Sequence, residues 1–241
     1  MHGPRWRVFY GAEAENYERA RYGSKYGQAF RSAHRAVTAQ LLAERTVRGA
    51  ALDVASGTGQ LIPCLMDRSN FLVATDLTPE MMGVSRRIHG PQVCYVQADA
   101  MKLPFSDACF DIVASSRFLH LFPPAEQLQI VREMVRVAKP GGIVLVDIYN
   151  ALPRRLLAKF INIYRRMKRK RAERDYHCSP AEAKAMLEIA GLKELAGRGA
   201  GSYFAAPLLW LPQSYLSRLL KSTVLANKLL AEQWVLAGRR D

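Results

Sequence analysis

The stretch that most constrains the fold of this chain is residues 52–60, which read LDVASGTGQ. Small and apolar residues from Ala50 to Val54 predict a strand buried on both faces, the small residues after it predict a tight turn, and a helix can begin at Gln60. A strand, a glycine turn and a helix in this order bind a cofactor at the carboxyl end of the first strand of an α/β sheet. Asp53 lies inside the strand, where an unpaired carboxylate is costly. It therefore needs a cationic ligand group or backbone N–H groups as partners.

The glycine spacing separates two cofactor classes. A dinucleotide-binding turn requires G-x-G-x-x-G, but Gly57 and Gly59 are followed by Ile62, so that pattern is broken. The remaining pattern, acidic-x-small-x-Gly-x-Gly, resembles the first motif of the class I S-adenosylmethionine-dependent methyltransferases. In that family the acidic position, here Asp53, lies near the cationic methionine portion of the cofactor. Ala55 stands where the family usually has glycine, and we expect a slightly tighter pocket from it.

A second carboxylate follows the next predicted strand. Residues 71–75 are apolar and end at Asp76, 17 residues beyond Gly59. A carboxylate at this strand tip can accept hydrogen bonds from both ribose hydroxyls, in NAD and in S-adenosylmethionine alike. The segment 78–80, Thr-Pro-Glu, then predicts a helix start with Thr78 as its cap.

A third carboxylate, Asp99, closes a strand predicted over Val93–Ala98. Residues 97–105, QADAMKLPF, resemble the ubiquinone- and menaquinone-type methyltransferases, which read acidic-Ala, two or three residues, then Leu-Pro-Phe at this place. In that family the aspartate accepts a hydrogen bond from the adenine amino group. The alternative is a strand-terminal aspartate that only caps a turn.

The strand predicted over Phe110–Ser115 is followed by a loop that runs beside the transferable methyl group in the resembling family. Relatives carry Leu-His-His where residues 119–121 read Leu-His-Leu. His120 is the first candidate for a general base, because imidazole titrates near neutral pH. His177 is the weaker candidate, for which a purely structural role is favoured. Arg117 is a candidate anchor for an acidic substrate group.

The N-terminal segment is expected to be a loop followed by a short helix over Ala12–Ala20 and an amphipathic helix over Gln28–Glu44. In the resembling family such a segment shields the cofactor; an aromatic-anchored surface segment is an equal alternative. The resemblance implies a cofactor site made of Tyr17, Arg21, Asp53, Ala55, Ser56, Gly57, Gly59, Asp76, Leu77, Asp99, Ala100 and Ser115. The substrate side is predicted to include Arg117, Tyr164 and Tyr203.

The alternation of strands and helices predicts an α/β fold with a doubly wound, mostly parallel, seven-stranded sheet. We expect a helix over 125–137, a K-P-G-G turn at 139–142 before a strand over 143–148, and a helix begun by Ser179 and Pro180. Strands over 192–195 and 234–237 follow, the last one antiparallel. The predicted parts are a cap over residues 1–45, a cofactor-binding core over 46–150, a lid insertion over 151–176 and the C-terminal part of the same sheet over 177–241.

The net charge of +14 is concentrated in one segment. Residues 154–174 hold ten Lys or Arg and one acid, a charge of +9, which leaves +5 for the rest of the chain. Apolar residues recur there at helical spacing, so a basic amphipathic helix is predicted. We rank a lid helix with a solvated positive face first, contact with an anionic membrane surface second, and RNA third.

Composition and cysteine usage narrow the protein class. The content of 49% hydrophobic and 23% charged residues is ordinary for a globular protein, and no stretch approaches the ~20 apolar residues of a membrane helix. The polar start, residues 1–7, argues against a secretory leader. Cys64, Cys94 and Cys109 are expected to be buried free thiols of a reducing compartment, and without a C-x-x-C pair no metal site is predicted.

Together these features predict a cytoplasmic enzyme that transfers a methyl group from S-adenosylmethionine to an O, N or C nucleophile of a small, largely apolar molecule, leaving S-adenosylhomocysteine. One alternative is a lipid or quinone methyltransferase that works at the inner membrane face through residues 154–174. Another is a non-catalytic binding module with the same fold. The expected partners are a small-molecule substrate and no nucleic acid, with a monomer and a homodimer both left open.

Overall fold

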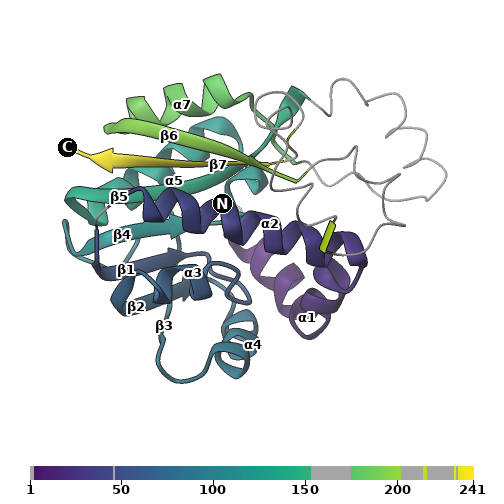
Figure 1. Cartoon of the computed structure of the whole chain (residues 1–241). Coiled ribbons are helices and arrows are strands. Elements are labelled where there is room, and N and C mark those ends of the chain that lie inside the picture. Colours follow the sequence, from purple (N-terminus) through teal and green to yellow (C-terminus); the bar gives the residue numbers. More distant parts are fainter. Residues whose placement is uncertain (1–2, 46, 153–174, 202–213, 216–230, 232) are drawn as a thin grey trace.

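The computed structural model describes residues 3–45, 47–152, 175–201, 214–215, 231 and 233–241 (Figure 1). In this part of the chain seven strands form one sheet in the order β3-β2-β1-β4-β5-β7-β6. The strands are β1 (Gly49–Val54), β2 (Ser69–Asp76), β3 (Cys94–Gln97), β4 (Phe110–Ser115), β5 (Ala138–Tyr149), β6 (Leu192–Ala200) and β7 (Gln233–Arg240). Strands β1 to β5 pair in parallel, and β7 runs antiparallel to both β5 and β6. The predicted doubly wound, mostly parallel sheet is confirmed, as is the antiparallel last strand.

Helices cover both faces of this sheet. They are α1 (Gly3–Tyr22), α2 (Lys25–Ala43), α3 (Ile62–Met66), α4 (Pro79–His89), the 3-10 turn η1 (Leu119–Leu121), α5 (Pro124–Val137) and α7 (Pro180–Ile189). Alternate residues of β1 face opposite layers, because Leu52 and Val54 pack with α5 and α7, whereas Ala51 packs with α2 and α3. Residues 51–54 are all buried, as a central strand between two helical layers requires.

The order of the strands creates a crevice between β1 and β4. The chain builds β1, β2 and β3 outward in one direction and then returns to the other side of β1 with β4. At such a reversal the loops leave the sheet on opposite faces, so the carboxyl ends of the two strands stand apart and a ligand can enter. Figure 1 shows α1 beside this edge of the sheet and α2 crossing one face of it.

The N-terminal segment differs from its prediction. One continuous helix, α1, replaces the expected loop and the short helix over 12–20. Pro4 lies in the first turn, where a missing N–H costs nothing, and Ala14 packs against Met81 and Val84 of α4. Tertiary packing therefore extends the helix beyond what the local pattern predicts. The second helix, α2, is confirmed, with Ser24 as its cap.

Three smaller expectations are wrong. Residues 139–142 are not a turn before the strand: they lie within β5, where Gly141 has a φ of +76° and the register with β4 shifts. Thr78 precedes α4 but its hydroxyl makes no capping bond. Cys94 is exposed, because it begins β3 at the edge of the sheet, whereas Cys64 is buried and Cys109 partly so.

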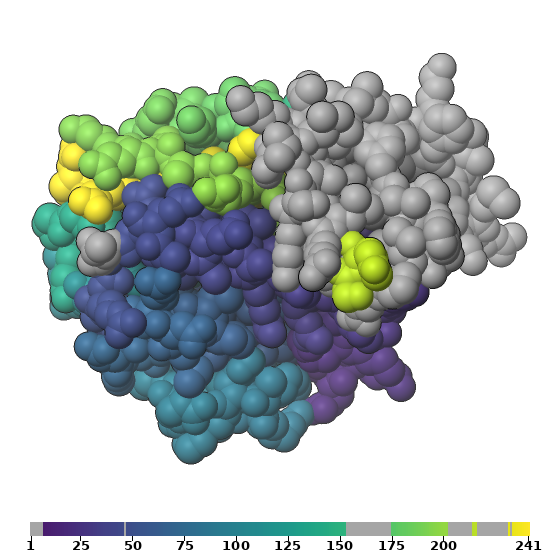
Figure 2. Space-filling model, viewed as in Figure 1, coloured from purple at the N-terminus to yellow at the C-terminus, as the bar shows by residue number. Residues whose placement is uncertain are grey.

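The C-terminal part follows its prediction more closely. Ser179 caps α7 in a reciprocal arrangement with Glu182, which accounts for the helix start. In the space-filling view the green and yellow C-terminal strands lie above the purple and blue N-terminal half (Figure 2). The basic segment 154–174 lies outside the described residues. Among the helices that the structure describes, none has the length and apolarity needed to span a bilayer.

Candidate functional site

The crevice between β1 and β4 is a cavity of about 630 Å³, bordered by the carboxyl ends of the strands, α1 and the loop that contains η1. Its volume lies in the range of about 300–1,000 Å³ that small-molecule sites occupy. The cavity brings together residues as far apart in the sequence as Arg7 and Gln129. The predicted site residues that line it are Tyr17, Ala55, Gly57, Asp76, Leu77, Asp99, Ala100 and Arg117.

The glycine turn after β1 has a backbone that favours residues without a large side chain. Gly57 has a φ of +53°, and a side chain added there would meet nothing within 4 Å, so the turn leaves open space toward the cavity. A side chain at Gly59 would meet the His89 ring, which closes that side of the turn. Ala55 also has a left-handed φ of +54°. The glycine that relatives carry at this position would adopt that conformation without strain.

Asp76 connects β2 to the glycine turn. One carboxylate oxygen accepts a hydrogen bond from the Gly57 N–H at 2.8 Å and the other accepts one from the Thr78 N–H at 2.8 Å. Burial raises the pKa of Asp76, and these backbone hydrogen bonds oppose the rise. The turn and the carboxylate therefore hold each other in place at the cavity wall, where the sequence predicts the ribose contact.

Asp53 does not line the cavity, although the sequence places it beside the cofactor. Its side chain is 1% exposed, on the same face of β1 as Ala51. Oδ2 has no hydrogen-bond partner among the described residues. Burial, and then the charge of Asp76, raise the pKa of Asp53 well above its ordinary value. Such a carboxyl group would be stabilised by a cation brought to it from the cavity side.

Asp99 lines the cavity and also caps a turn, as the alternative interpretation holds. Its Oδ1 accepts a hydrogen bond from the Met101 N–H at 2.9 Å. The Leu-Pro-Phe segment after it is held by α5, because Arg136 donates to the carbonyls of Leu103 and Phe105. The hydrogen bond from Met101 thus orients the side chain of Asp99 at the cavity wall.

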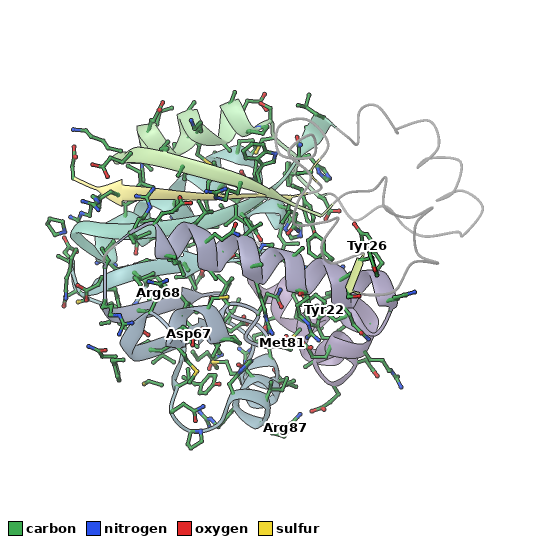
Figure 3. The ribbon with its side chains drawn as sticks, viewed as in Figure 1. Tyr22, Tyr26, Asp67, Arg68, Met81 and Arg87 are labelled. Carbon is green, nitrogen blue, oxygen red and sulfur yellow. The ribbon has the colours of Figure 1, made fainter. Side chains whose placement is uncertain are left out.

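Helix α1 lies across the glycine turn. Glu18 accepts a hydrogen bond from the Thr58 hydroxyl at 2.7 Å and forms an ion pair with Arg31 of α2. Tyr17 lines the cavity, whereas Arg21 is exposed and lies 5.6 Å from the ring centroid of Tyr17. Figure 3 shows Met81, another cavity residue, between α1 and α4. The predicted cover over the cavity is thus provided by Tyr17 and not by Arg21.

A buried polar cluster on the other side of β4 was not predicted. Asp147 of β5 accepts hydrogen bonds from His34 Nε2 at 2.8 Å, the Ser116 hydroxyl at 2.8 Å and the Arg117 N–H at 2.7 Å. Burial opposes ionisation of Asp147, but the hydrogen bond and charge of His34 lower its pKa below the ordinary value. An aspartate within the apolar strand 143–148 is the signal that could have found this cluster, since the same reasoning drew attention to Asp53.

The two candidate bases lie away from the cavity lining. His120 is partly buried in η1, with its ring 4.2 Å from that of Tyr149. Burial lowers the pKa of His120 to about 3. A base this weak accepts a proton poorly at neutral pH. His177 also lies against Tyr149, with 5.5 Å between the ring centroids.

The remaining predicted residues contact the cavity indirectly or not at all. Ser56 and Ser115 are buried, and their hydroxyls have no hydrogen-bond partner among the described residues. Tyr164 and Tyr203 lie outside the described residues. In the described part of the chain no group of three or more metal-binding side chains is present.

The arrangement fits an S-adenosylmethionine-like ligand better than a dinucleotide. The left-handed glycine turn leaves space for a ligand, Asp53 has an unsatisfied oxygen near it, and Asp76 and Asp99 face the same cavity. Aromatic and aliphatic side chains close the far side, with Phe118 and Phe122 in edge contact at 4.9 Å. The acidic end of the cavity thus lies at the tips of β2 and β3, and its apolar end is formed by the aromatic residues after β4; Glu126 and Gln129 of α5 also line the cavity.

Comparisons with known proteins agree with this arrangement. Residues 52–146 match the family described as a methyltransferase domain. The chain is 39% identical over 99 residues to an uncharacterised methyltransferase of Synechocystis, covering 41% of this chain and 46% of that one. It is 36% identical over 121 residues to the ubiquinone/menaquinone biosynthesis C-methyltransferase of Azotobacter vinelandii, covering 47% of each. The aligned region thus spans less than half the length of these curated relatives.

The fold itself is matched over nearly the whole chain. The structure of magnesium protoporphyrin IX methyltransferase from Synechocystis PCC 6803, solved with bound SAH, has a TM-score of 0.69 over 99% of both chains at 16% identity. At this identity the likeness concerns the fold alone. The resemblance seen in the sequence and the cofactor class that it implies are confirmed by the family match. Residues 52–146 match the methyltransferase domain family, and the chain has the fold of the solved methyltransferase that it resembles.

Proposed function

We propose that this protein transfers a methyl group from S-adenosylmethionine to a nucleophilic O, N or C atom of a small, largely apolar molecule. The observation that carries the proposal is the division of the cavity. Its acidic end is built from the cofactor motifs, with Gly57, Asp76 and Asp99, and its other end is lined by Phe118 and Phe122. A cofactor and an apolar acceptor would thus meet inside one enclosed space.

Methyl transfer requires mainly that the protein position the acceptor next to the methyl group of the cofactor. The cofactor supplies an already electrophilic methyl group, so the chain must align the acceptor and exclude water. We assign the acidic end to the cofactor, with Asp53 near its cationic part, Asp76 at the ribose and Asp99 at the adenine. Tyr17 would cover the cofactor, and the apolar end would hold the acceptor beside the loop of residues 115–118.

We propose no general base from His120 for this reaction. Its pKa of about 3 leaves it a poor proton acceptor at neutral pH. The acceptor would then react as an atom that is already nucleophilic, or lose its proton to another group. One relative is named a demethylmenaquinone methyltransferase, and another a ubiquinone/menaquinone biosynthesis C-methyltransferase. A quinone-like ring is therefore the first acceptor skeleton to test.

Two measurements test the proposal in sequence. In a thermal shift assay, S-adenosylhomocysteine is expected to raise the melting temperature and NAD is expected to leave it unchanged, because the third glycine of a dinucleotide turn is missing. The opposite pattern would overturn the cofactor assignment. Incubation with methyl-labelled S-adenosylmethionine and small-molecule extracts, followed by identification of the labelled product, would then name the acceptor. Label found only in protein or nucleic acid would contradict a small-molecule acceptor.

A further inference from the structure

The cavity wall beside β4 carries a cation whose backbone is held in an unusual conformation. Arg117 has a left-handed φ of +57°, which a residue with a side chain adopts only when its surroundings impose it. Asp147 imposes it by accepting the Arg117 N–H at 2.7 Å and the neighbouring Ser116 hydroxyl at 2.8 Å. His34, fully buried on α2, holds the same carboxylate from the other side at 2.8 Å. Three elements far apart in sequence therefore fix where the Arg117 side chain begins.

The guanidinium of Arg117 is only partly satisfied by the protein. Its Nη1 donates to the Tyr22 hydroxyl at 3.0 Å, and its central carbon lies 5.3 Å from the Tyr22 ring centroid. Nε is buried and has no hydrogen-bond partner in the described part of the chain. Both oxygens of Asp147 are already occupied by other donors. Nε is therefore an unused donor of the guanidinium, and a planar carboxylate brought against it could accept hydrogen bonds from one edge of the group.

The charge on Arg117 is retained although the group lies in a confined site. Burial acts to lower its pKa, but the hydroxyls of Tyr149, Tyr22 and Tyr17 and the carboxylate of Asp147 raise the pKa well above its ordinary value. Arg117 lines the cavity beside Phe118 and Phe122. This combination of a fixed cation and aromatic walls differs from the acidic end, where Asp76 and Asp99 lie.

A second arginine at the cavity lies at the other end. Arg7 of α1 borders the main cavity and also a second hollow that it shares with Leu77, Glu80 and Asp99. It therefore lies on the side of the cavity where Glu80 and Asp99 are. Arg117 differs from Arg7 because it is partly buried, whereas Arg7 is exposed, and because it lies next to Phe118.

We propose that Arg117 binds a carboxylate of the methyl acceptor, and hence that the acceptor is a small aromatic or apolar acid. The inference rests on the proposed function, because it assigns the apolar end of the cavity to the acceptor. A carboxylate could reach Arg117 from one other source, the amino acid end of the cofactor itself. The experiment below separates these two sources.

The first arm measures the cofactor. Isothermal titration of S-adenosylhomocysteine into the wild-type chain and Arg117→Gln is expected to give dissociation constants within threefold of each other. A loss of about 100-fold in Arg117→Gln would assign Arg117 to the cofactor carboxylate and overturn the proposal. If wild type itself fails to bind S-adenosylhomocysteine, the proposed function fails, independently of Arg117.

The second arm measures the acceptor side with benzoate as the probe. Benzoate is expected to bind the wild-type complex with S-adenosylhomocysteine and to be detected by ligand-observed nuclear magnetic resonance, whereas benzamide, of the same shape and without charge, binds at least tenfold more weakly. Arg117→Gln should lose benzoate binding, and Arg117→Lys should keep part of it. Equal binding of benzoate and benzamide, or unchanged binding of benzoate to Arg117→Gln, would overturn the proposal.

Two further variants control for a loss of binding that is caused by misfolding. Arg132→Gln, an exposed arginine on α5, is the matched control and is expected to bind both ligands as wild type does. Tyr22→Phe removes only the hydroxyl that orients Nη1, and it is expected to weaken benzoate severalfold with an unchanged affinity for S-adenosylhomocysteine. Arg117→Gln could melt at a lower temperature than Arg132→Gln. In that case the binding of benzoate to Tyr22→Phe and to Arg117→Lys tests the proposal. Benzoate binding as strong as in wild type in both variants would contradict it.

Discussion

Two buried aspartates lie on either side of β4, and the protein treats them in opposite ways. Asp147 on β5 accepts three hydrogen bonds, and its pKa is lowered by His34 in spite of its burial. Asp53 on β1 is as deeply buried, but Oδ2 has no partner among the described residues, and burial raises its pKa well above its ordinary value. The first carboxylate is satisfied by the protein, and the second has an oxygen without a donor in the described part of the chain.

This difference separates a structural role from a binding role. A buried carboxylate with a full set of donors stabilises the fold and fixes the neighbouring loop. A buried carboxylate without donors costs stability in the free protein, and it persists where a ligand supplies the missing charge. Substitution of Asp147 and of Asp53 tests this difference, because the first change should alter the free energy of unfolding and the second should alter the affinity for the cofactor.

Asp147→Ala is expected to have the largest effect. The change leaves His34, the Ser116 hydroxyl and the Arg117 N–H without their shared acceptor, and breaking such a buried pair costs about 3–5 kcal/mol. Urea denaturation at pH 7 would measure the loss in the free energy of unfolding. Asp107→Ala is the control, because its salt bridge with Arg136 is exposed, and a change below about 1 kcal/mol is expected.

The pH dependence of Asp147 has a definite sign. Its folded pKa lies below the unfolded value of 3.8, so its contribution to stability is fully present above about pH 4 and is lost as the pH falls through the lower folded value. If Asp147→Ala were as stable as Asp107→Ala, the cluster around Asp147 would not stabilise the fold.

Asp53→Asn is expected to show the reverse pattern. The amide cannot ionise, so the free protein should be as stable as wild type at pH 7 or more stable, while the affinity for S-adenosylmethionine should fall at least tenfold, or about 1.4 kcal/mol. Because the folded pKa is raised, wild type loses stability as the pH rises from about 4 toward that value, and the variant does not. Urea denaturation at pH 5 and pH 8 and isothermal titration measure both effects.

Asp67→Asn is the control for this change. Asp67 is exposed at the end of α3 (Figure 3), and its replacement should alter neither quantity. If Asp53→Asn instead lowers stability and binds S-adenosylmethionine normally, Asp53 is a structural residue like Asp147, and the contrast between the two sides of β4 is lost.

The acidic end of the cavity could be predicted from the sequence because its signals are local. Asp76 and Asp99 each follow a short apolar strand, and the glycine turn is read from consecutive residues. Parallel strands bring their carboxyl ends to one edge, so residues far apart in sequence meet without any long-range information. The alternation of strands and helices along the chain was predicted from the same local signals, whereas the antiparallel direction of β7 came from the family resemblance.

The other end could not be predicted, because its contacts depend on tertiary packing. His34 and Asp147 are 113 residues apart, and no local pattern joins a helix in the N-terminal segment to the fifth strand. The left-handed backbone of Arg117 follows from that cluster, not from its own sequence. Likewise α1 begins earlier than its pattern indicates because Ala14 packs on α4.

His120 provides the last and smallest test, on the side of β4 where Asp147 lies. Burial lowers its pKa to about 3, with the Asp147 charge only partly opposing the shift. The ring is therefore expected to remain neutral between pH 5 and pH 8, and its carbon-bound proton should show no titration in that range by nuclear magnetic resonance. His120→Gln removes the ring contact with Tyr149 and should lower the free energy of unfolding at pH 7 by about 1 kcal/mol. Below about pH 6.5 wild type loses stability as unfolded histidine takes up protons, and the variant does not. A midpoint near 6.5 in the wild-type titration would show that the ring is accessible to solvent, and would restore it as a candidate base.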